Sequence, residues 1–338
     1  MVKARKFVFA SIFDGEPKQS DFELQFEELP TLEDGDVLVE TIYWSVDPYM
    51  RVQMPKLPVN STMIGENIAR VIESNDPKYP VGSYVWSFFG WRDLTIFNNN
   101  MDKKEKGGNH IPPYIVEPIA NIPLSQRLAS LGMTGLSAYF GLIELCAPKA
   151  NETIVISGAA GAVGSIVGQI GKILNCRVVG VAGSAEKCRW LKEELNFDAA
   201  IDYKNENIEE ALQRLAPNGI DVYFDNVGGE LSSIVMSQMN EFGRVALCGA
   251  ISTYNLKSDR TTNIPIQPII IAKQLKVEGF IVNRWFMRWE EGVAKLSQWI
   301  LAGQLKYRET ISNGFDSLPT AFIGMLRGDN IGKALVKK

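Results

Sequence analysis

A run of small residues at positions 158–164 has the composition to hold a phosphate group. It reads Gly-Ala-Ala-Gly-Ala-Val-Gly, follows the β-branched run at 154–156, and leads into apolar residues at helical spacing from Val163. Small residues let a backbone approach a ligand closely, and the N–H groups at the start of a helix attract anions. This order of strand, turn and helix predicts a site for the pyrophosphate of a dinucleotide.

The turn departs from the pattern Gly-x-Gly-x-x-Gly at its first position, where this chain has an alanine. The strand before the turn and the helix after it give the motif its weight, because the glycine spacing alone is weak evidence. We expect the phosphates of the cofactor to lie on Ala159, Gly161, Ala162, Val163 and Gly164.

The residues after the next strand distinguish NADP from NAD. A chain that binds NAD usually carries an acidic residue at the end of this strand, where it binds the ribose 2′-hydroxyl. Here the strand at 177–182 is followed by Gly-Ser-Ala-Glu-Lys, which offers Ser184 and Lys187 to a 2′-phosphate, and Tyr203 follows the third strand. The sequence therefore predicts NADPH as the cofactor. The alternative is that Lys187 is only a solvated lysine on the next helix.

Alternating strands and helices from about residue 123 onward must position these residues. Such alternation predicts a parallel sheet with right-handed crossovers. A helix is expected over 128–147, ahead of the first strand. The expected strands are 153–157, 177–182, 199–201, 221–224, 244–247 and 276–282.

The two ends of the chain have a different pattern. Short apolar runs separated by proline, glycine and aspartate fill the first 120 residues, and the tail from residue 306 returns to short strands. We expect the tail to pack on an N-terminal β domain, which makes that domain discontinuous. The expected domains are residues 1–122 with 305–338, and residues 123–304.

Composition limits the class of protein. The 338 residues, of which 46% are hydrophobic and 22% charged, suit two globular domains. The net charge of −4 gives no electrostatic basis for binding nucleic acid or an anionic membrane, and no apolar run is long enough to cross a bilayer. The four cysteines lack Cys-x-x-Cys spacing, which predicts reduced thiols in a cytoplasmic protein.

Five further motifs accompany the turn. They are SVDPYMR at 45–51, LGMTGLSAY at 131–139, DNVGG at 225–229, CGAISTYN at 248–255 and GDNIGK at 328–333. With the turn, they make the chain resemble, nearly from end to end, the zinc-independent alkenal and enone reductases of the medium-chain dehydrogenase/reductase superfamily. The resemblance implies an α/β fold with a doubly wound parallel Rossmann sheet, a discontinuous GroES-like β domain, and a homodimer.

A zinc-dependent alcohol dehydrogenase of the same superfamily is not expected. A catalytic zinc needs three protein ligands. The chain has no cysteine before Cys146, and His110 is its one histidine. We therefore expect no metal site and interpret His110 as a loop residue.

The resemblance implies that NADPH reduces the α,β double bond of an alkenal or enone, including lipids similar to a 15-oxo-prostaglandin, by hydride transfer to the β-carbon. Negative charge then develops on the carbonyl oxygen, and a hydrogen-bond donor must meet it. Tyr254 follows the fifth strand, at the edge of the sheet where ligands bind. We expect Tyr254 to be that donor and a cofactor contact; the alternative is a tyrosine that only packs in its loop.

The remaining expected contacts are spread along the chain. Asn226 and Asn330 are expected to reach the cofactor, with tight turns as the alternative. The resemblance places Met133 and Thr134 near the nicotinamide. Tyr49 is expected to line the substrate channel or to be a buried supporting aromatic residue.

Apolar residues after the sixth strand have two interpretations. Phe280 and Trp285 wall a lipophilic substrate pocket in one, and in the other they belong to a dimer interface. Cys248, Phe280 and Val282 complete the expected cofactor contacts.

Two other functions stay open at this point. An NADPH:quinone oxidoreductase shares the fold and the cofactor, and a non-catalytic NADPH-binding protein would bind the cofactor without turnover. The resemblance also implies an NADP-dependent oxidation of the 12-hydroxyl of leukotriene B4 as a further activity of the same site.

Overall fold

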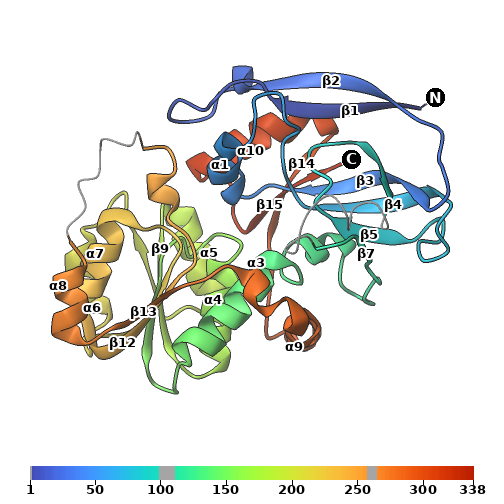
Figure 1. The fold of residues 1–338 in the computed structure, drawn as a ribbon. Coiled ribbons are helices and arrows are strands. Elements are labelled where there is room, and N and C mark those ends of the chain that lie inside the picture. The colour runs from blue at the N-terminus through green and yellow to red at the C-terminus, as the bar shows by residue number, and fades with distance from the viewer. Residues whose placement is uncertain (1, 99–110, 257–264) are drawn as a thin grey trace. The chain divides into compact units, whose positions relative to one another are not determined.

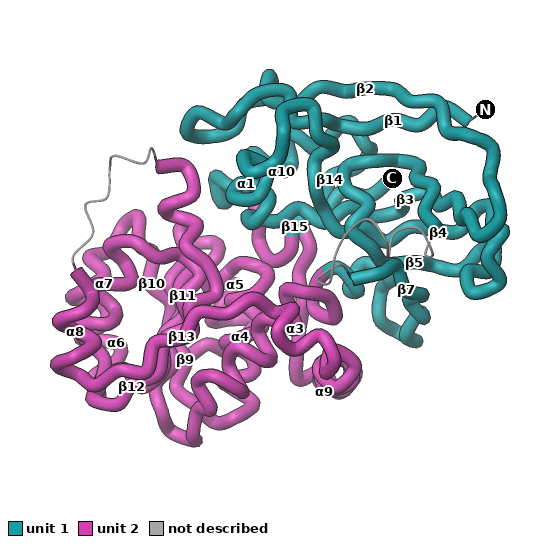
Figure 2. The backbone as a smooth tube through the Cα atoms, viewed as in Figure 1, with its two compact units in different colours: residues 1–128, 310–329, 334–338 teal, residues 129–309, 330–333 magenta. Residues whose placement is uncertain are grey.

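The computed structural model describes residues 2–98, 111–256 and 265–338. The chain forms two compact units, which Figure 2 distinguishes by colour. Unit 1 comprises residues 1–128, 310–329 and 334–338, and unit 2 comprises residues 129–309 and 330–333. His110 and the lysines at 103–106 lie outside the described residues.

The units differ from the expected domains in their boundaries, which follow residues 128 and 309 instead of 122 and 304, and in the place of residues 330–333. This short segment belongs to unit 2, although the tail around it belongs to unit 1. The N–H of Gly332 donates to the carbonyl of Ala160 at 2.8 Å, and the N–H of Lys333 donates to that of Arg308 at 3.0 Å. The first of these backbone bonds attaches the segment to the small-residue turn, and the second attaches it to Arg308.

Unit 1 is built from antiparallel strands. Its larger sheet has the order β14-β15-β3-β4-β5-β7, with β6 also paired to β3, and β1 pairs with β2 in a separate sheet (Figure 1). The strands are β1 (Val2–Phe9), β2 (Phe22–Leu29), β3 (Asp36–Ser45), β4 (Asn67–Ser74), β5 (Tyr84–Ser87), β6 (Leu94–Asn98), β7 (Tyr114–Ile115), β14 (Glu309–Asn313) and β15 (Lys333–Lys337). The helices with α geometry are α1 (Tyr49–Gln53) and α10 (Leu318–Arg327).

Aromatic residues from both ends of the chain share one core in unit 1. The ring of Phe7 stacks on that of Phe315 at 5.2 Å, and the ring of Phe22 lies 5.4 Å from that of Trp91. Phe322 of α10 meets Phe22 edge-on at 6.1 Å. Because aromatic burial contributes strongly to a core, the C-terminal tail completes a discontinuous β unit.

Unit 2 contains a six-stranded parallel sheet in the order β10-β9-β8-β11-β12-β13. The chain runs outward from β8 to β10 and then returns to β11 on the other side of β8. Ligands of such sheets bind at the carboxyl ends of the strands beside this reversal. The strands are β8 (Thr153–Ile156), β9 (Arg177–Ala182), β10 (Ala199–Asp202), β11 (Ile220–Asp225), β12 (Met239–Leu247) and β13 (Lys276–Gly279).

Helices cover both faces of this sheet. Helices α6, α7 and α8 lie on one face, and α3, α4 and α9 lie on the other (Figure 1). The predicted α/β fold with a doubly wound parallel sheet and a separate β-rich part is confirmed. The helices are α3 (Met133–Phe140), α4 (Gly164–Ile173), α5 (Ala185–Glu193), α6 (Ile208–Leu215), α7 (Gly229–Ser237), α8 (Gln267–Lys273) and α9 (Trp289–Leu301).

The helix expected over 128–147 begins later, at Met133, and changes its geometry along its length. A short 3-10 turn (Leu124–Leu128) is followed by α3, which continues as a wider π-helical segment (Gly141–Cys146). A Cβ on Gly135 would lie 1.8 Å from the carbonyl oxygen of Ser130, and one on Gly141 would lie 2.6 Å from the ring of Phe280. The glycines that weaken the helix are therefore positions of close packing.

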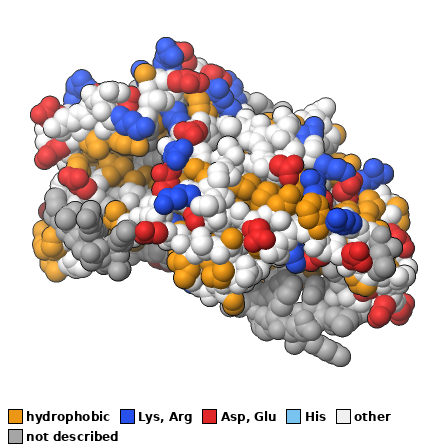
Figure 3. Space-filling model, turned by 90° about the horizontal axis from the view of Figure 1, so that it is seen from above, with side chains coloured by type: hydrophobic (Ala, Val, Ile, Leu, Met, Phe, Trp, Pro, Cys, Tyr) orange, Lys and Arg blue, Asp and Glu red, His pale blue; other side chains and the backbone are white. Residues whose placement is uncertain are grey.

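The face drawn in Figure 3 carries charges of both signs and hydrophobic side chains. No helix among the described residues is long and apolar enough to cross a membrane. On the face in Figure 3, lysine and arginine side chains are interspersed with aspartate and glutamate.

Candidate functional site

Two strand ends meet at the reversal of unit 2, and Ser157 joins them. Ser157 follows β8, and Asn226 follows β11. The N–H of Asn226 donates to Ser157 Oγ at 2.9 Å, and Asn226 Nδ2 donates to the carbonyl oxygen of Ser157 at 2.7 Å. Within the described residues, no hydrogen bond to Asn226 Oδ1 is formed. That oxygen is therefore an available acceptor beside the small-residue turn.

The turn itself has room for no larger residue at its last glycine. A Cβ on Gly164 would lie 2.5 Å from the carbonyl oxygen of Gly158 and 2.7 Å from the Cα of Ala159. Gly158 has a φ of +59°, in the region that favours glycine. Gly164 begins α4, and the N–H groups at a helix start have no acceptor within the helix. The expected contacts Gly161, Ala162, Val163 and Gly164 thus lie at the start of this helix, and their binding of phosphate stays a prediction.

Ala159, where the motif would have glycine, is explained by the neighbouring strand. Ala159 is fully buried, and its N–H donates to the carbonyl of Val181 at 3.0 Å. A Cβ on Gly180 of β9 would lie 2.9 Å from the Cβ of Ala159. The missing side chain of Gly180 therefore makes room for the methyl group of Ala159, which keeps the turn close to the sheet.

The three residues expected at a 2′-phosphate lie together after β9 and β10. Ser184 caps α5, and its Oγ accepts a hydrogen bond from the N–H of Lys187 at 3.2 Å. The ring of Tyr203 covers Gly183, where a Cβ would lie 2.8 Å from it, and Tyr203 is 49% exposed. The acidic residue nearby, Asp202, accepts hydrogen bonds from its own turn. Ser184 and Lys187, both half-buried, and the exposed ring of Tyr203 thus lie at these strand ends.

Asn330 reaches the same region from the tail. The segment that contains it pairs with the turn at Gly161 and Gly332. Asn330 Nδ2 donates to the carbonyl oxygen of Gly332 at 2.7 Å. Asn330 therefore lies beside the turn, as a cofactor contact requires.

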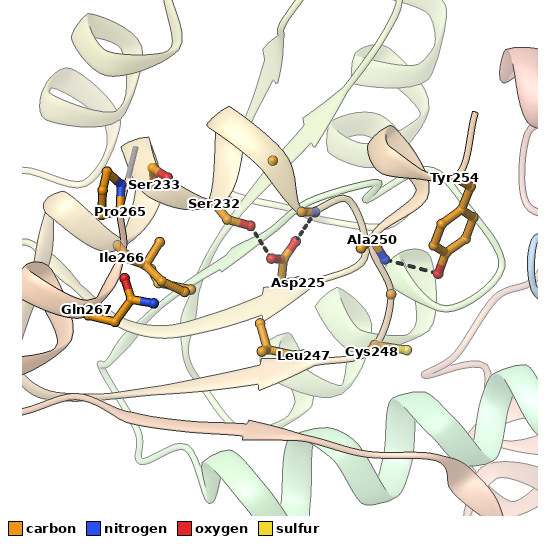
Figure 4. A pocket seen from close by; sticks show the side chains of 14 residues that line it. Asp225, Ser232, Ser233, Leu247, Cys248, Ala250, Tyr254, Pro265, Ile266 and Gln267 are labelled. Carbon is orange, nitrogen blue, oxygen red and sulfur yellow. Dashed lines mark hydrogen bonds between the residues drawn. The ribbon is translucent and has the colours of Figure 1, made fainter. Parts of the chain in front are cut away.

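Tyr254 lies in the loop after β12, at the same edge of the sheet. Figure 4 shows its hydroxyl directed toward the backbone of Ala250, whose N–H donates to Tyr254 Oη at 3.1 Å. Because Oη acts as an acceptor here, the hydroxyl hydrogen can be donated to another group. The accepted bond also polarises the hydroxyl and strengthens it as a donor.

Cys248 begins the loop after β12 that carries Tyr254, here called the Tyr254 loop (residues 248–256). Burial, and next the carboxylate of Asp225, raise the pKa of its thiol to about 12. The thiol is therefore neutral near pH 7 and is not a nucleophile.

A cavity of about 510 Å³ lies on the side of α7 and α8. Its walls include Asp225, Ser232, Leu247, Tyr254 and Gln267 (Figure 4). No residue of the turn at 158–164 is part of its wall, so the cavity is separate from the predicted phosphate site at the start of α4.

Met133 and Thr134 begin α3. Both are half-buried, and Thr134 Oγ1 donates to the carbonyl of Ala129 at 2.9 Å. The hydroxyl of Thr134 thus fixes the entry to α3, and its role toward the nicotinamide stays a prediction.

The aromatic residues after β13 pack on α3. Phe280 is half-buried, and its ring lies 6.1 Å from that of Phe224. Trp285, which is 8% exposed, stacks on Phe140 with ring centroids 5.4 Å apart, and Val282 is also buried. Expected strand residues 280–282 lie beyond β13, which ends at Gly279. In this structure Trp285 supports α3, and its contact with substrate stays a prediction.

Tyr49 is the expected substrate contact in unit 1. Its hydroxyl is enclosed and has no hydrogen-bond partner among the described residues. Burial, and next the carboxylates of Glu66 and Asp47, raise the pKa of this phenol well above its ordinary value. The hydroxyl therefore keeps its proton and remains a neutral donor.

Sequence reasoning missed the buried polar residues beneath the site. Asp225 ends β11 and accepts hydrogen bonds from Ser157, Tyr223 and Ser232. The available signal was a carboxylate directly after the apolar run Val222–Phe224 of this strand.

Among the described residues, no group of three His, Cys, Asp or Glu side chains is arranged to hold a metal ion.

Two family models match the chain. One, described as the N-terminal domain of oxidoreductase, covers residues 5–104, and the other, described as zinc-binding dehydrogenase, covers residues 162–299.

Full-length relatives are similar along the whole chain. Prostaglandin reductase 1 of Bos taurus is 46% identical over 340 residues and covers 100% of both chains. The 2-alkenal reductase (NADP⁺-dependent) of Nicotiana tabacum is 37% identical and covers 99% of this chain and 97% of its own. The crystal structure of CurA from Vibrio vulnificus in complex with NADPH has 36% identity and a TM-score of 0.89, with 99% of each chain covered. The chain therefore belongs to the prostaglandin reductase family within the medium-chain dehydrogenase/reductase superfamily.

Proposed function

We propose that the protein reduces the carbon–carbon double bond of alkenals and enones with NADPH. The observation that carries this proposal is the Tyr254 hydroxyl, which is held by the Ala250 N–H and has its hydrogen available beside the cofactor site. The names of the relatives, a prostaglandin reductase and an NADP⁺-dependent 2-alkenal reductase, support the same reaction.

The residues present fit NADPH. Gly164 lets the turn pack closely on Gly158 at the start of α4, where N–H groups of the first helical turn could meet the pyrophosphate. Ser184, Lys187 and Tyr203 would hold the 2′-phosphate and the adenine side of the cofactor. The lack of a carboxylate directly after β9 favours NADPH over NADH.

Further contacts are proposed around the nicotinamide half. Asn226 Oδ1 is an acceptor at the end of β11, and Asn330 lies beside the turn. Met133, Thr134, Cys248, Phe280 and Val282 are proposed as the remaining cofactor contacts.

When bound, NADPH supplies the hydride that the substrate's β-carbon receives. The carbonyl oxygen of the substrate then becomes an enolate oxygen, and Tyr254 donates its hydroxyl hydrogen bond to it. A neutral phenol placed in advance at the developing charge lowers the barrier without reorganisation of solvent. The α-carbon takes up a proton to complete the reduction. No metal is needed, because the conjugated carbonyl already polarises the double bond.

The substrate is proposed to be lipophilic, such as a 15-oxo-prostaglandin. Phe280 and Trp285 offer apolar contacts, and Tyr49 offers a neutral hydroxyl. Oxidation of the 12-hydroxyl of leukotriene B4 with NADP⁺ is proposed as a further activity of this site.

The substrate class is tested by following NADPH consumption with a short alkenal, a long hydroxyalkenal, a 15-oxo-prostaglandin and a quinone. We expect turnover of the alkenals and the prostaglandin, with the carbonyl retained in the product. Turnover of the quinone alone would assign the protein to the NADPH:quinone oxidoreductases. Binding of NADPH without turnover of any substrate would make it a non-catalytic binding protein.

We also propose a homodimer built on β13. This strand is the edge of the six-stranded sheet, and an unpaired edge can pair with a second copy. Ile281 and Met287, directly after it, are 74% and 92% exposed. Ile281→Asp should shift the mass measured by light scattering from dimer to monomer, whereas Val81→Asp, at an exposed position in unit 1, should not. A wild-type monomer would contradict the proposal.

A cytoplasmic location is proposed from the thiols. All four cysteines are free, and three of them are buried. Free thiols persist in a reducing compartment. Localisation of a tagged full-length chain by cell fractionation tests this.

A further inference from the structure

Asp225 is a buried carboxylate that the proposed chemistry does not use. It is 1% exposed at the end of β11. Its Oδ1 accepts hydrogen bonds at 2.9 Å from Ser157 Oγ, Tyr223 Oη and the N–H groups of Val227 and Gly228. Its Oδ2 accepts a hydrogen bond from Ser232 Oγ. Five donors surround two oxygens, which matches a group that only accepts.

The carboxylate fixes the turn that follows β11. Two of its five donors are backbone N–H groups of that turn, and Gly228 there has a φ of +71°. A Cβ on Gly228 would lie 2.9 Å from the Cβ of Ala250. The turn is thus held from inside by Asp225 and packs outward against the Tyr254 loop (Figure 4).

The Tyr254 loop is attached to this turn by backbone bonds. The N–H groups of Cys248 and Gly249 donate to the carbonyl of Asp225 at 2.8 and 3.1 Å. The N–H of Ser252 donates to the carbonyl of Val227 at 3.0 Å, and its Oγ donates to the same oxygen at 2.6 Å. A shift of the turn therefore moves the loop that carries Tyr254.

A second connection leads from Asp225 to the cofactor site. Ser157 Oγ donates to Asp225 and accepts from the N–H of Asn226, and Ser157 directly precedes Gly158. The carboxylate thus aligns the ends of β8 and β11 on one side and the Tyr254 loop on the other.

We propose that Asp225 is a positioning residue for the reduction, which sets where the Tyr254 hydroxyl lies relative to Asn226. It acts through the 225–228 turn. The inference rests on the proposed function, because it assumes that Tyr254 acts on the substrate.

The test compares two substitutions at Asp225. Asp225→Ser shortens the side chain and removes most of the five hydrogen bonds. Asp225→Asn keeps a carbonyl oxygen for the donors at Oδ1, and its amide N–H can donate a hydrogen bond to Ser232 Oγ. Since small misplacements at a reaction centre are costly, we expect Asp225→Ser to lower kcat by about tenfold or more, with Asp225→Asn within about threefold of the parent. Asp221→Ala is the matched control. This carboxylate at the other end of β11 accepts from Thr153 N and Asn240 Nδ2, and its loss should lower Tm but leave kcat unchanged.

A double-mutant cycle with Tyr254→Phe separates positioning from general damage. If Asp225 acts through Tyr254, Asp225→Ser should cost less than about threefold in kcat in the Tyr254→Phe background, because coupled residues are not additive. NADPH binding, measured by tryptophan fluorescence, should weaken in Asp225→Ser through the Ser157–Asn226 connection. If Asp225→Ser does not fold, Tyr223→Phe combined with Ser232→Ala removes two of the five donors, and its kcat loss must likewise vanish without the Tyr254 hydroxyl.

Equal losses in both backgrounds, or an unchanged kcat in a folded Asp225→Ser protein, would overturn the inference while leaving the proposed function intact. Full activity of Tyr254→Phe itself would instead overturn the role of Tyr254 in the proposed function.

Discussion

Replacement of Tyr254 by phenylalanine is the sharpest test of a single side chain. The change removes one hydroxyl and keeps the ring in its loop. Loss of one donor to a developing oxyanion lowers kcat by about 10²–10³-fold. The 3.1 Å bond from the Ala250 N–H is also lost, and a neutral hydrogen bond at a half-buried position contributes only about 0.5–1 kcal/mol to stability. Catalysis should therefore fall far more than the free energy of unfolding.

The assay is steady-state reduction of a short alkenal, with Tm and NADPH affinity measured on the same samples. NADPH affinity should change little, because the sites proposed for the cofactor's phosphates are residues 158–164 and the residues after β9. Tyr139→Phe is the control, since Tyr139 is a half-buried tyrosine of α3 that hydrogen-bonds Glu291. If Tyr254→Phe kept kcat within about threefold of the parent, the hydroxyl would not be the donor that the mechanism requires.

Three further predictions concern the cofactor site and the buried thiols. Lys187→Ala should raise the KM for NADPH by an amount equivalent to about 1–3 kcal/mol and leave the KM for NADH unchanged, because it removes a charge-assisted phosphate contact. An equal loss for both cofactors would argue against that contact. Gly164→Ala should abolish NADPH binding by calorimetry, because the new Cβ would lie 2.5 Å from the Gly158 carbonyl oxygen; normal affinity would show that the turn does not hold the phosphates. The pKa values of Cys146 and Cys248 are raised by burial to about 12 from an ordinary 9.0, so the unfolded chain loses these protons first. Below pH 9.0 these thiols should leave the free energy of unfolding unaffected. As the pH rises toward 12, each should lower that free energy by up to about 1.4 kcal/mol per pH unit. The fall should be smaller in Cys146→Ala, and urea unfolding at several pH values checks this.

Local patterns in the sequence were sufficient to predict a site where its chemistry and its structure both depend on one short segment. The small-residue turn, the strand before it and the helix after it are contiguous, so their order predicts both the geometry and the ligand. Ser184 is a similar case, because its place before a helix makes it a cap and leaves its hydroxyl at the strand end.

Features that depend on packing between distant parts of the chain could not be predicted from local patterns. The helix expected over 128–147 changes to a π-helical segment at Gly141, which packs against the ring of Phe280, a residue distant in sequence. Asp225 and Ser157 are 68 residues apart in sequence, and their hydrogen bond exists only once β8 and β11 are neighbours. The alanine at 159 likewise depends on Gly180 of β9.

In the proposed reaction the double bond, and not the carbonyl, receives the hydride. This is measured with NADPH deuterated at C4 and an enone, followed by NMR of the product. We expect a saturated ketone with deuterium on the β-carbon. An allylic alcohol with deuterium on the former carbonyl carbon would contradict it.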